Sequence, residues 1–307
     1  MLQNGEPVKS IAQLIGVHRS TVYRELNRNV SPYSGKYKYK RAQKMADDRK
    51  HRFQKPRKLT PGVRNRIIIL LHKDWSPCQI SGRMKMLGRP MVSHETIYEM
   101  IRRDRAKGGK LYQHCRFQLK HCNHWIRRRG QKLPDDRKSI DSRPAQADGT
   151  RFGDWEMDLI VGADNSSALT MVERSTNMLI IRKLPRKRKA QDVTKAVISA
   201  LKPIKDCVLT ITTDNGPEFS DYRTIEKKLE SQVYYAHPYC PWQKGDIENH
   251  NMLIRQYIPK GFNINTISTQ YIASVESRIN ARPRKKLNFR TPDFVFKKRM
   301  SKFALGT

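Results

Sequence analysis

The stretch Thr210–Phe219 reads TITTDNGPEF and decides how the second half of the chain is organised. Its β-branched residues at 211–213 favour a strand, and the Asn-Gly-Pro run that follows Asp214 ends it. The pattern therefore places Asp214 at the carboxyl end of a strand. Because functional side chains concentrate at such strand ends in α/β folds, we expect Asp214 to take part in chemistry.

Two further stretches carry a carboxylate on a separate element. Residues 152–161 read FGDWEMDLIV and place Asp158 on a strand, and residues 242–254 read WQKGDIENHNMLI and place Glu248 on a helix. Carboxylate oxygens are the ligands that hard divalent cations prefer. Three carboxylates on three elements of a basic chain therefore suggest a divalent-metal site that acts on nucleic acid.

The charge of the whole chain points to the same class of partner. Its 307 residues include 62 Lys and Arg against 28 Asp and Glu, a formal net charge of +34. Such an excess predicts nucleic acid as the partner, and it is larger over residues 1–150, which we expect to hold most of the DNA.

The same composition bears on the location of the chain. No apolar run approaches the length of a membrane span and no signal peptide opens the sequence. Five cysteines without a tight framework fit a reducing compartment. We therefore expect no membrane partner and a cytoplasmic, nucleoid-associated location in a bacterium.

Residues 10–27, SIAQLIGVHRSTVYRELN, have the spacing of a helix-turn-helix. Ile11 and Ala12 should begin a short first helix, Gly16 makes the turn, and Val22 and Leu26 form the inner face of a second helix. An ordinary helical hairpin with a solvated basic face is the alternative. The side chains left free to contact DNA are His18, Arg19, Ser20, Thr21, Tyr23, Arg24 and Arg28.

A second pair of helices is predicted further on. Ser76 and Pro77 form a helix start, and Ser93 caps another helix that begins HETIYEMIRR. DNA contact, including one from His94, is the favoured function for this pair, and dimerisation is the rival.

The most basic stretch is residues 108–132. Its Arg127, Arg128 and Arg129 are predicted to grip phosphates. The His and Cys residues at 114, 115, 121, 122 and 124 fit no standard zinc-finger spacing, so no zinc is expected.

From Thr150 the pattern becomes one of strands and helices in alternation. Strands are predicted at 155–161, 168–173, 178–183, 207–213 and 233–236, and helices at 191–201, 221–229, 245–257 and 269–279. That order is typical of an RNase H-like fold. The predicted fold class is therefore multidomain: a helical helix-turn-helix DNA-binding region followed by an α/β RNase H-like, integrase-type catalytic domain.

The sequence also predicts where these domains lie. Residues 1–56 are expected to form the N-terminal helix-turn-helix domain, and residues 57–132 a second such domain with the basic segment. Residues 133–149 are expected to form a linker, and residues 150–307 the catalytic domain.

The pattern alone leaves the choice of acids open. Period-two alternation puts Asp154, Glu156 and Asp158 on one face of their strand. Asp246 and Glu248 lie about 200° apart around a helix, so only one of them can face the same metals. Two Mg²⁺ or Mn²⁺ ions held by three such acids can activate a water or 3′-hydroxyl and stabilise the leaving oxygen at a phosphodiester.

Several blocks in order resemble the insertion-sequence family thirty transposases. The catalytic blocks are GDWEMDLI, TDNGPEF, HPYCPWQKGDIENHNMLIRQY and RPRKKLNFRTP, and the N-terminal motifs IGVHRSTVYRELNRN, WSPCQISGR and VSHETIY are similar too. The family's W-E-x-D, T-D-N-G and G-x-x-E-N blocks select Asp158, Asp214 and Glu248, and Glu248 follows Asp214 at the family's spacing of 34.

The resemblance implies an Mg²⁺-dependent DDE enzyme that binds the terminal inverted repeats of its element. Such an enzyme cleaves there, joins the ends to DNA, usually through a circular intermediate, and works as a homo-oligomer on double-stranded DNA. Lys244 and Arg255 flank the acids and are expected to contact DNA.

The chain departs from the family pattern where Met157 and Met252 replace Gly beside the acids. Bulky side chains there are expected to narrow the site, which keeps a catalytically impaired DNA-binding regulator as the alternative; a general RNase H-type nuclease is a third reading. Trp155 and Trp242 are expected to pack in the core rather than stack on bases.

Overall fold

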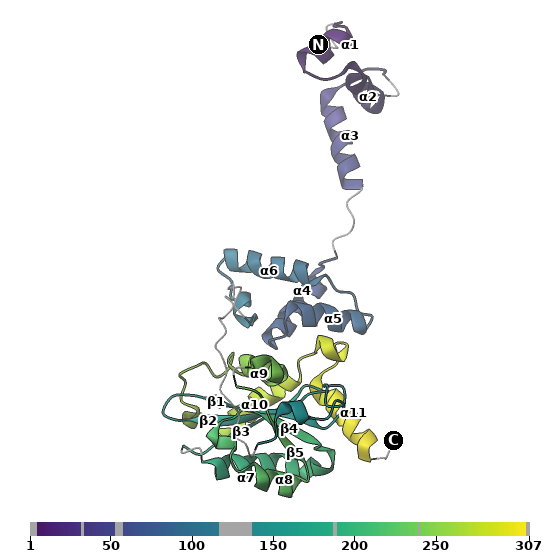
Figure 1. Cartoon of the computed structure of the whole chain (residues 1–307). Helices are drawn as coiled ribbons and strands as arrows, with labels where there is room; N and C mark the ends of the chain where they lie inside the picture. The colour runs from purple at the N-terminus through teal and green to yellow at the C-terminus, as the bar shows by residue number, and fades with distance from the viewer. Residues whose placement is uncertain are drawn as a thin grey trace. The chain divides into compact units, whose positions relative to one another are not determined.

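The computed structural model describes residues 5–31, 34–52, 58–116, 137–186, 189–238 and 240–304. The chain forms two compact units, Met1–Lys58 and Leu59–Thr307 (Figure 1). The predicted phosphate contacts Arg127, Arg128 and Arg129 lie outside the described residues, as do the His and Cys residues at 121, 122 and 124.

The first unit contains α1 (Val8–Leu14), α2 (Arg19–Asn29) and α3 (Tyr39–Arg52). Gly16 has φ of 69°, a conformation that suits glycine, and the amide of Val17 donates to the carbonyl of Ala12 across the turn. Ile11, Ala12 and Val22 form a small buried cluster on which Leu26 packs, so the predicted inner face is confirmed. The first helix begins at Val8, three residues earlier than expected.

The second unit opens with α4 (Pro61–His72), α5 (Pro77–Met86) and α6 (His94–Ala106). Ser76 and Gln79 form a complete capping box at the start of α5, and Ser93 caps α6 through the amide of Thr96. Both predicted helix starts are therefore confirmed. The three helices enclose a cluster of their own, which includes Ile67, Leu71, Ile80, Ile97 and Ile101.

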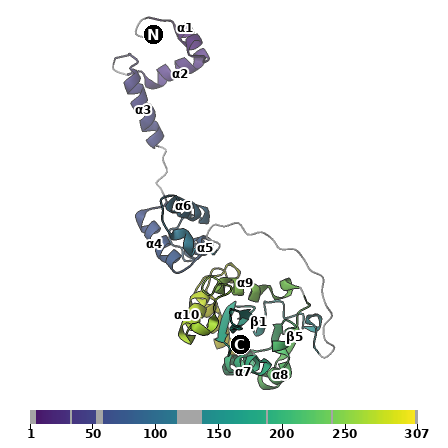
Figure 2. The ribbon, with the colours of Figure 1, turned by 90° about the vertical axis from the view of Figure 1, so that its left-hand side faces the viewer.

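A five-stranded mixed sheet forms the centre of the second unit (Figure 2). Its strands are β1 (Asp154–Val161), β2 (Ser167–Glu173), β3 (Met178–Lys183), β4 (Thr210–Thr213) and β5 (Gln232–Tyr235). They lie in the order β3-β2-β1-β4-β5, with β1, β2 and β3 antiparallel and β4 and β5 parallel to β1. The end of β4 and the middle of β1 consequently lie side by side.

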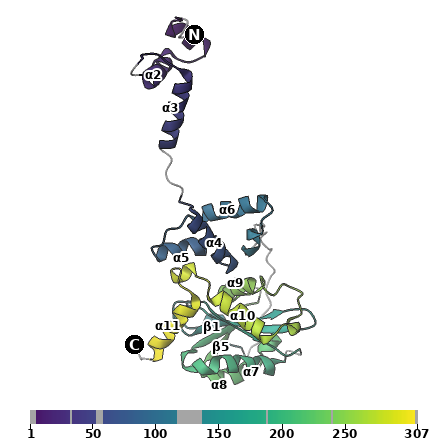
Figure 3. The same cartoon turned by 180° about the vertical axis from the view of Figure 1, so that it is seen from behind.

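Helices cover both faces of the sheet (Figure 3). One face packs on α7 (Ala190–Leu201) and α8 (Tyr222–Leu229), and the other on α9 (Gly245–Ile254) and α10 (Thr269–Asn280). The last helix is α11 (Pro292–Ala304), whose Phe296 packs against the first of these two clusters. The observed architecture is the predicted one, a helix-turn-helix region and an α/β integrase-type core.

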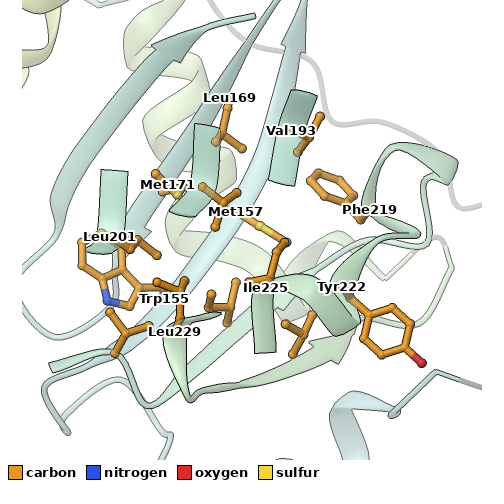
Figure 4. Close-up of a cluster of buried hydrophobic side chains, with 14 of the residues drawn as sticks. Trp155, Met157, Leu169, Met171, Val193, Leu201, Phe219, Tyr222, Ile225 and Leu229 are labelled. Atoms are coloured by element: carbon orange, nitrogen blue, oxygen red, sulfur yellow. The ribbon is translucent and has the colours of Figure 1, made fainter. Parts of the chain in front are cut away.

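Strand β1 divides its side chains between the two faces. Trp155 and Met157 are fully buried in the cluster beneath α7 and α8 (Figure 4). The alternate residues Asp154, Glu156 and Asp158 therefore point to the opposite face, toward the side on which α9 packs. This alternation positions the acids of the site.

One strand is shorter than the sequence suggests. β4 begins at Thr210 rather than Cys207, because Lys202–Cys207 forms a 3₁₀ segment that continues from α7. Its first residue pairs with Asp154 of β1. The shortening leaves the carboxyl end of the strand, and hence Asp214, where the pattern placed it.

Residues 137–149, the described part of the predicted linker, lie along the edge of the sheet. The amide of Tyr235 donates to the carbonyl of Lys138, and Ser139 forms a parallel bridge with Tyr235. Ile140 is buried there. Among the described residues, every helix is too short or too polar to span a lipid bilayer.

Candidate active site

Three carboxylates from three elements line one pocket of about 230 Å³, which we call the acid pocket. Asp158 comes from β1, Asp214 directly follows β4, and Glu248 lies in the first turn of α9. Asn215, His237 and Lys244 also line it. The structure thus brings together the three acids that the sequence singled out.

Asp158 is held in place by its neighbours. Its Oδ1 accepts from the amide of Leu159 at 2.9 Å, and its Oδ2 accepts from Nδ2 of Asn251 on α9 at 2.8 Å. Burial raises the pKa of this carboxyl, an effect that the Lys244 ammonium opposes and that the negative charge of Asp214 reinforces. A cation placed in the pocket would favour its charged form.

Asp214 is oriented by the turn that follows β4. Its Oδ1 accepts from the amide of Gly216 at 3.0 Å, a local bond of the kind that Asp forms in turns. Asn215 fastens the same turn to the neighbouring strand, since its Nδ2 donates to the carbonyl of Ala236 at 2.8 Å. The other oxygen of Asp214, Oδ2, faces the pocket and accepts from Nζ of Lys244 at 3.4 Å.

On α9, Glu248 and Asp246 face different surroundings. Glu248 lines the acid pocket, and burial raises the pKa of its carboxyl, with Lys244 lowering it and Asp158 raising it further. Asp246 instead accepts from Nδ2 of Asn177 at 3.1 Å and from Nζ of Lys286 at 3.3 Å. The helix therefore presents Glu248, and not Asp246, to the other two acids.

The other two acids of β1 have structural partners. Glu156 forms an ion pair with Arg174 at 3.0 Å and accepts from the amide of Ile247 at 2.8 Å. Asp154 accepts from Nη2 of Arg151 at 2.6 Å. Both are fully buried, so neither has an oxygen available to the pocket.

Lys244 places a positive charge among the acids. Its Nζ lies 3.7 Å from Oδ1 of Asp158 and 3.4 Å from Oδ2 of Asp214, and its side chain is only 8% exposed. The lysine ends the 3₁₀ turn Pro241–Lys244 immediately before α9. It partly neutralises two acids that would otherwise repel each other.

Comparisons with known proteins identify the family to which the chain belongs. An integrase core domain family matches residues 150–241, and a helix-turn-helix domain family matches residues 1–29. The transposase for insertion sequence element IS4351 of Bacteroides fragilis is 43% identical over 300 residues, which cover 97% of this chain and 92% of the relative. The chain belongs to the insertion-sequence transposases.

Other relatives extend the family. The transposase for IS1086 of Cupriavidus metallidurans is 34% identical, covering 93% of this chain and 87% of the relative. Transposase InsI for IS30A of Escherichia coli K12 is 31% identical, covering 95% and 79%. The predicted family is therefore confirmed, and the protein is a DNA transposase, an enzyme that cuts DNA and transfers strands.

Among solved structures, the catalytic core domain of BIV integrase matches with a TM-score of 0.40 and 19% identity. The match covers 49% of this chain and 98% of that domain.

The two methionines that depart from the family pattern do not line the acid pocket of this transposase. Met157 is fully buried on the opposite face of β1, and Met252 is 51% exposed on α9. The expected narrowing of the site is therefore absent from the described residues, because neighbours in sequence point to different faces of a strand or helix.

The two tryptophans behave differently. Trp155 is buried in the core beneath α7 and α8, as expected. Trp242 is 66% exposed, so the prediction that it packs in the core is wrong. It lies in the short 3₁₀ turn before α9.

The predicted DNA contacts of the first unit lie on and beside α2. His18 is its N-cap and accepts from the amide of Ser20, and Ser20 in turn accepts from Arg24 at 3.2 Å. Most of the remaining predicted contacts are exposed; they are Arg19, Thr21, Tyr23 and Arg28. These assignments stay predictions.

The second group of predicted contacts is divided. His94 is exposed at the start of α6 and lies 3.4 Å from Glu95. Arg255 donates to the carbonyls of Val161 at 2.9 Å and Pro259 at 3.3 Å, so its guanidinium is engaged with the protein. Lys244 lies in the acid pocket itself.

Two site residues were missed at the level of sequence. Asn251 bonds Asp158 and lies three positions after Glu248, a spacing that puts both on one helix face and was available as a signal. His237 lines the pocket and its Nε2 lies 2.7 Å from Oδ2 of Asp141. The contact between His237 and Asp141 could not be predicted from the sequence, because the two residues lie far apart in the chain.

The acid pocket suits a divalent cation by its donors. An integrase-type acidic core implies the use of divalent metal, and the three carboxylates that line the pocket are the oxygen donors that Mg²⁺ takes. In the described residues no group of three or more His, Cys, Asp or Glu side chains is close enough to hold an ion without movement. The Lys244 ammonium lies between two of these acids, where it occupies part of the space that a cation would take.

Proposed function

We propose that the transposase cleaves and joins the ends of its element with Asp158, Asp214 and Glu248 as ligands of two Mg²⁺ or Mn²⁺ ions. The observation that carries this assignment is the single pocket that the three side chains share, although they come from β1, the end of β4 and α9. The alternative acids of β1 and α9 are occupied by Arg174, Arg151 and Lys286.

The divalent ions, when bound, would polarise the phosphodiester and stabilise its attacking and leaving oxygens. The chain's own groups hold the geometry: the amide of Gly216 fixes Asp214, and Asn251 fixes Asp158. Lys244, which contacts Asp158 and Asp214, would give up these contacts once the acids hold divalent ions, and its ammonium would then be available to a DNA phosphate.

Recognition of the terminal inverted repeats falls to the first unit. In a helix-turn-helix the second helix lies in the major groove with its first residues against the base edges. Here those residues are Arg19, Ser20, Thr21 and Tyr23 of α2. Arg24 and Arg28 then contact the backbone, with His94 and the Arg127–Arg129 run as further contacts from the second unit.

Joining two ends requires two active sites, and the described residues of one chain hold a single pocket lined by these three acids. The enzyme therefore works as a homo-oligomer assembled on double-stranded DNA, in the nucleoid of a bacterial cytoplasm.

The test is cleavage and strand joining on DNA that carries the element's own ends. Asp158→Asn, Asp214→Asn and Glu248→Gln are expected to abolish cutting while repeat binding remains. Asp246→Asn is the matched control, since it removes a carboxylate from the same helix turn outside the pocket. A wild-type protein that binds the ends with Mg²⁺ and never nicks them is instead a DNA-binding regulator.

A further inference from the structure

A second pocket, of about 270 Å³, lies on another face of α9. Asn249, Leu253 and Gln256 line it from α9 and the turn that follows, whereas Glu248 and Asn251 serve the acid pocket. Its other walls come from the α4–α5 turn and from residues 282–289. We call it the arginine pocket, because Arg116, Arg282 and Arg284 line it.

The arginines are held mainly by neutral oxygens. Arg116 donates to Oδ1 of Asn249 at 2.9 Å. Arg282 donates to Oε1 of Gln256 at 2.8 Å and to the hydroxyl of Tyr257, and Arg284 donates to the carbonyl of Ile279 at 3.2 Å. These contacts fix the guanidinium groups without neutralising them.

Negative charge is scarce in this pocket. Among the described residues that line it, Asp74 alone is acidic, and it lies 3.8 Å from Arg282. Asp74 is already shared, since it accepts from Tyr257 at 2.8 Å and from Arg278 at 2.7 Å and contacts His114 at 3.1 Å. Among the described lining residues, positive charges therefore outnumber negative ones.

Two of the arginines that line the pocket are deeply buried. The Nε–H groups of Arg282 and Arg284 are buried and have no hydrogen-bond partner in the described part of the chain. The Arg282 side chain is only 3% exposed. Burial, reinforced by the charges of Arg282 and Arg116, lowers the pKa of Arg284 to about 10. Like charges held together in this way are costly in a free protein unless an anion compensates them.

We propose that the arginine pocket seats a phosphate group of the DNA backbone. Guanidinium forks match the paired oxygens of a phosphate, and the pocket of about 270 Å³ has room for such a group with part of the backbone that carries it. DNA as the source of the phosphate rests on the proposed function, whereas the anion site itself stands on the pocket's own residues.

The position of the pocket gives such a phosphate a second effect. The walls join Asp74 and Gln79 of the helical part to α9 and to the loop after α10. That loop is fastened to α5, because Arg83 donates to the carbonyl of Phe289 at 3.0 Å. A bound phosphate consequently tightens the helical part, residues 59–116, on the helix that carries Glu248.

The experiment uses the full chain and Arg284→Gln, with Lys195→Gln as the matched control. Lys195 is an exposed cation on α7, across the sheet from the pocket. Thermal unfolding is followed in pyrophosphate and in chloride at equal ionic strength, and duplex DNA binding is followed over a range of salt. Arg284→Lys serves as a second variant, because it keeps the positive charge but lacks the paired N–H donors of the guanidinium group.

We expect pyrophosphate to raise the unfolding temperature of the wild type and of Lys195→Gln, and not that of Arg284→Gln. In chloride, Arg284→Gln should be at least as stable as the wild type. Its affinity for duplex DNA should fall about tenfold, and the slope of log affinity against log salt should become shallower by about 1. Arg284→Lys should lie between the two.

Three results would overturn the proposal. One is a pyrophosphate response that survives in both Arg284 variants. Another is an Arg284→Gln protein that is less stable in chloride and binds DNA normally, because Arg284 would then serve packing alone. A pyrophosphate response lost in the variant with an unchanged DNA salt slope would leave a free-anion site and remove DNA as its source. The pyrophosphate arm does not depend on whether the enzyme cuts DNA.

Discussion

At the scale of single residues, Lys244 is the side chain on which the acid pocket depends most. It lies against Asp158 and Asp214 with almost no exposure to water. A cation that enters must either displace this ammonium or bind beside a like charge. The lysine therefore sets how tightly the pocket holds a metal before DNA arrives.

Lys244→Met is expected to bind Mn²⁺ about tenfold more tightly than the wild type in the absence of DNA. A like charge about 4 Å away costs a few kcal/mol at the effective dielectric of a protein surface, and water screens part of it. Isothermal titration calorimetry measures the change, with Lys195→Met as the control. Unchanged or weaker Mn²⁺ binding would show that the lysine does not compete with the metal.

Two acids on one strand should respond to mutation in opposite ways. Glu156→Ala leaves Arg174 buried without its carboxylate and is expected to lower the free energy of unfolding by roughly 3 kcal/mol. Asp158→Asn is expected to leave stability nearly unchanged and to abolish cutting. Urea unfolding, measured beside end cleavage, separates the two. A stable Glu156→Ala protein that fails to cut would place Glu156 in the catalytic machinery instead.

The same residues show where prediction from sequence stops. The β1 pattern identified a strand with three acids on one face, but strand periodicity cannot rank residues that share a face. What separates them is contact with Arg174, Arg151 and Asn251, which come from other parts of the chain. Family resemblance pointed to Asp158, and the contacts supply a physical reason.

At the scale of elements, the helices and strands themselves could be predicted from the sequence, whereas the packing at the turns between them could not. The helix starts at Ser76 and Ser93 follow from capping chemistry read directly from the sequence. The exposure of Trp242 did not follow, because it depends on what packs over the turn before α9. The arginine pocket could not be predicted from the sequence either, since the residues that line it come from segments far apart in the chain.

Asp74 joins two groups of elements within the second unit. It lies between α4 and α5 with φ of 58°, and it bonds Tyr257 and Arg278 of the core. Burial works against its charge, but the bonds from His114 and Tyr257 and the charges of Arg282 and Arg278 lower the pKa of its carboxyl below the usual 3.8. The charged form is thus the one that the fold favours.

Asp74→Asn is expected to lower the free energy of unfolding by about 2 kcal/mol at pH 7, since several charged hydrogen bonds weaken together. Because the folded pKa lies below 3.8, the stabilisation is complete above that pH and is lost as the pH falls through the folded pKa. Denaturant unfolding from pH 7 to pH 3 should show the wild-type advantage shrinking only at the acid end. An advantage that disappears well above pH 3.8 would show that the charge of Asp74 is not its source.

At the scale of the whole molecule, a net charge of +34 makes affinity for DNA easy and selectivity hard. Phosphate contacts hold any sequence equally well. Selectivity therefore has to come from the few side chains that meet base edges, which we assign to α2 of the first unit.

Removal of residues 1–58 should bring the ratio of affinities for end DNA and for random duplex DNA close to 1. The general affinity for DNA should be retained. The second unit has its own sheet and cores and should keep its circular dichroism spectrum. Fluorescence anisotropy at 50 and 200 mM salt measures both quantities, and full-length binding should weaken ~10³-fold across that range if about six phosphates are neutralised. A preference that survives the truncation would transfer base recognition to α5 and α6.

The strand order β3-β2-β1-β4-β5 also governs when activity arises during synthesis. On the ribosome the first unit emerges early and folds locally, and the β1–β3 meander follows from neighbouring segments. Asp214 joins Asp158 only when β4 inserts beside β1, and Glu248 arrives last on α9. A growing chain can therefore hold DNA well before it can cut it, and translation that stops short of α9 releases a product that binds without cleaving.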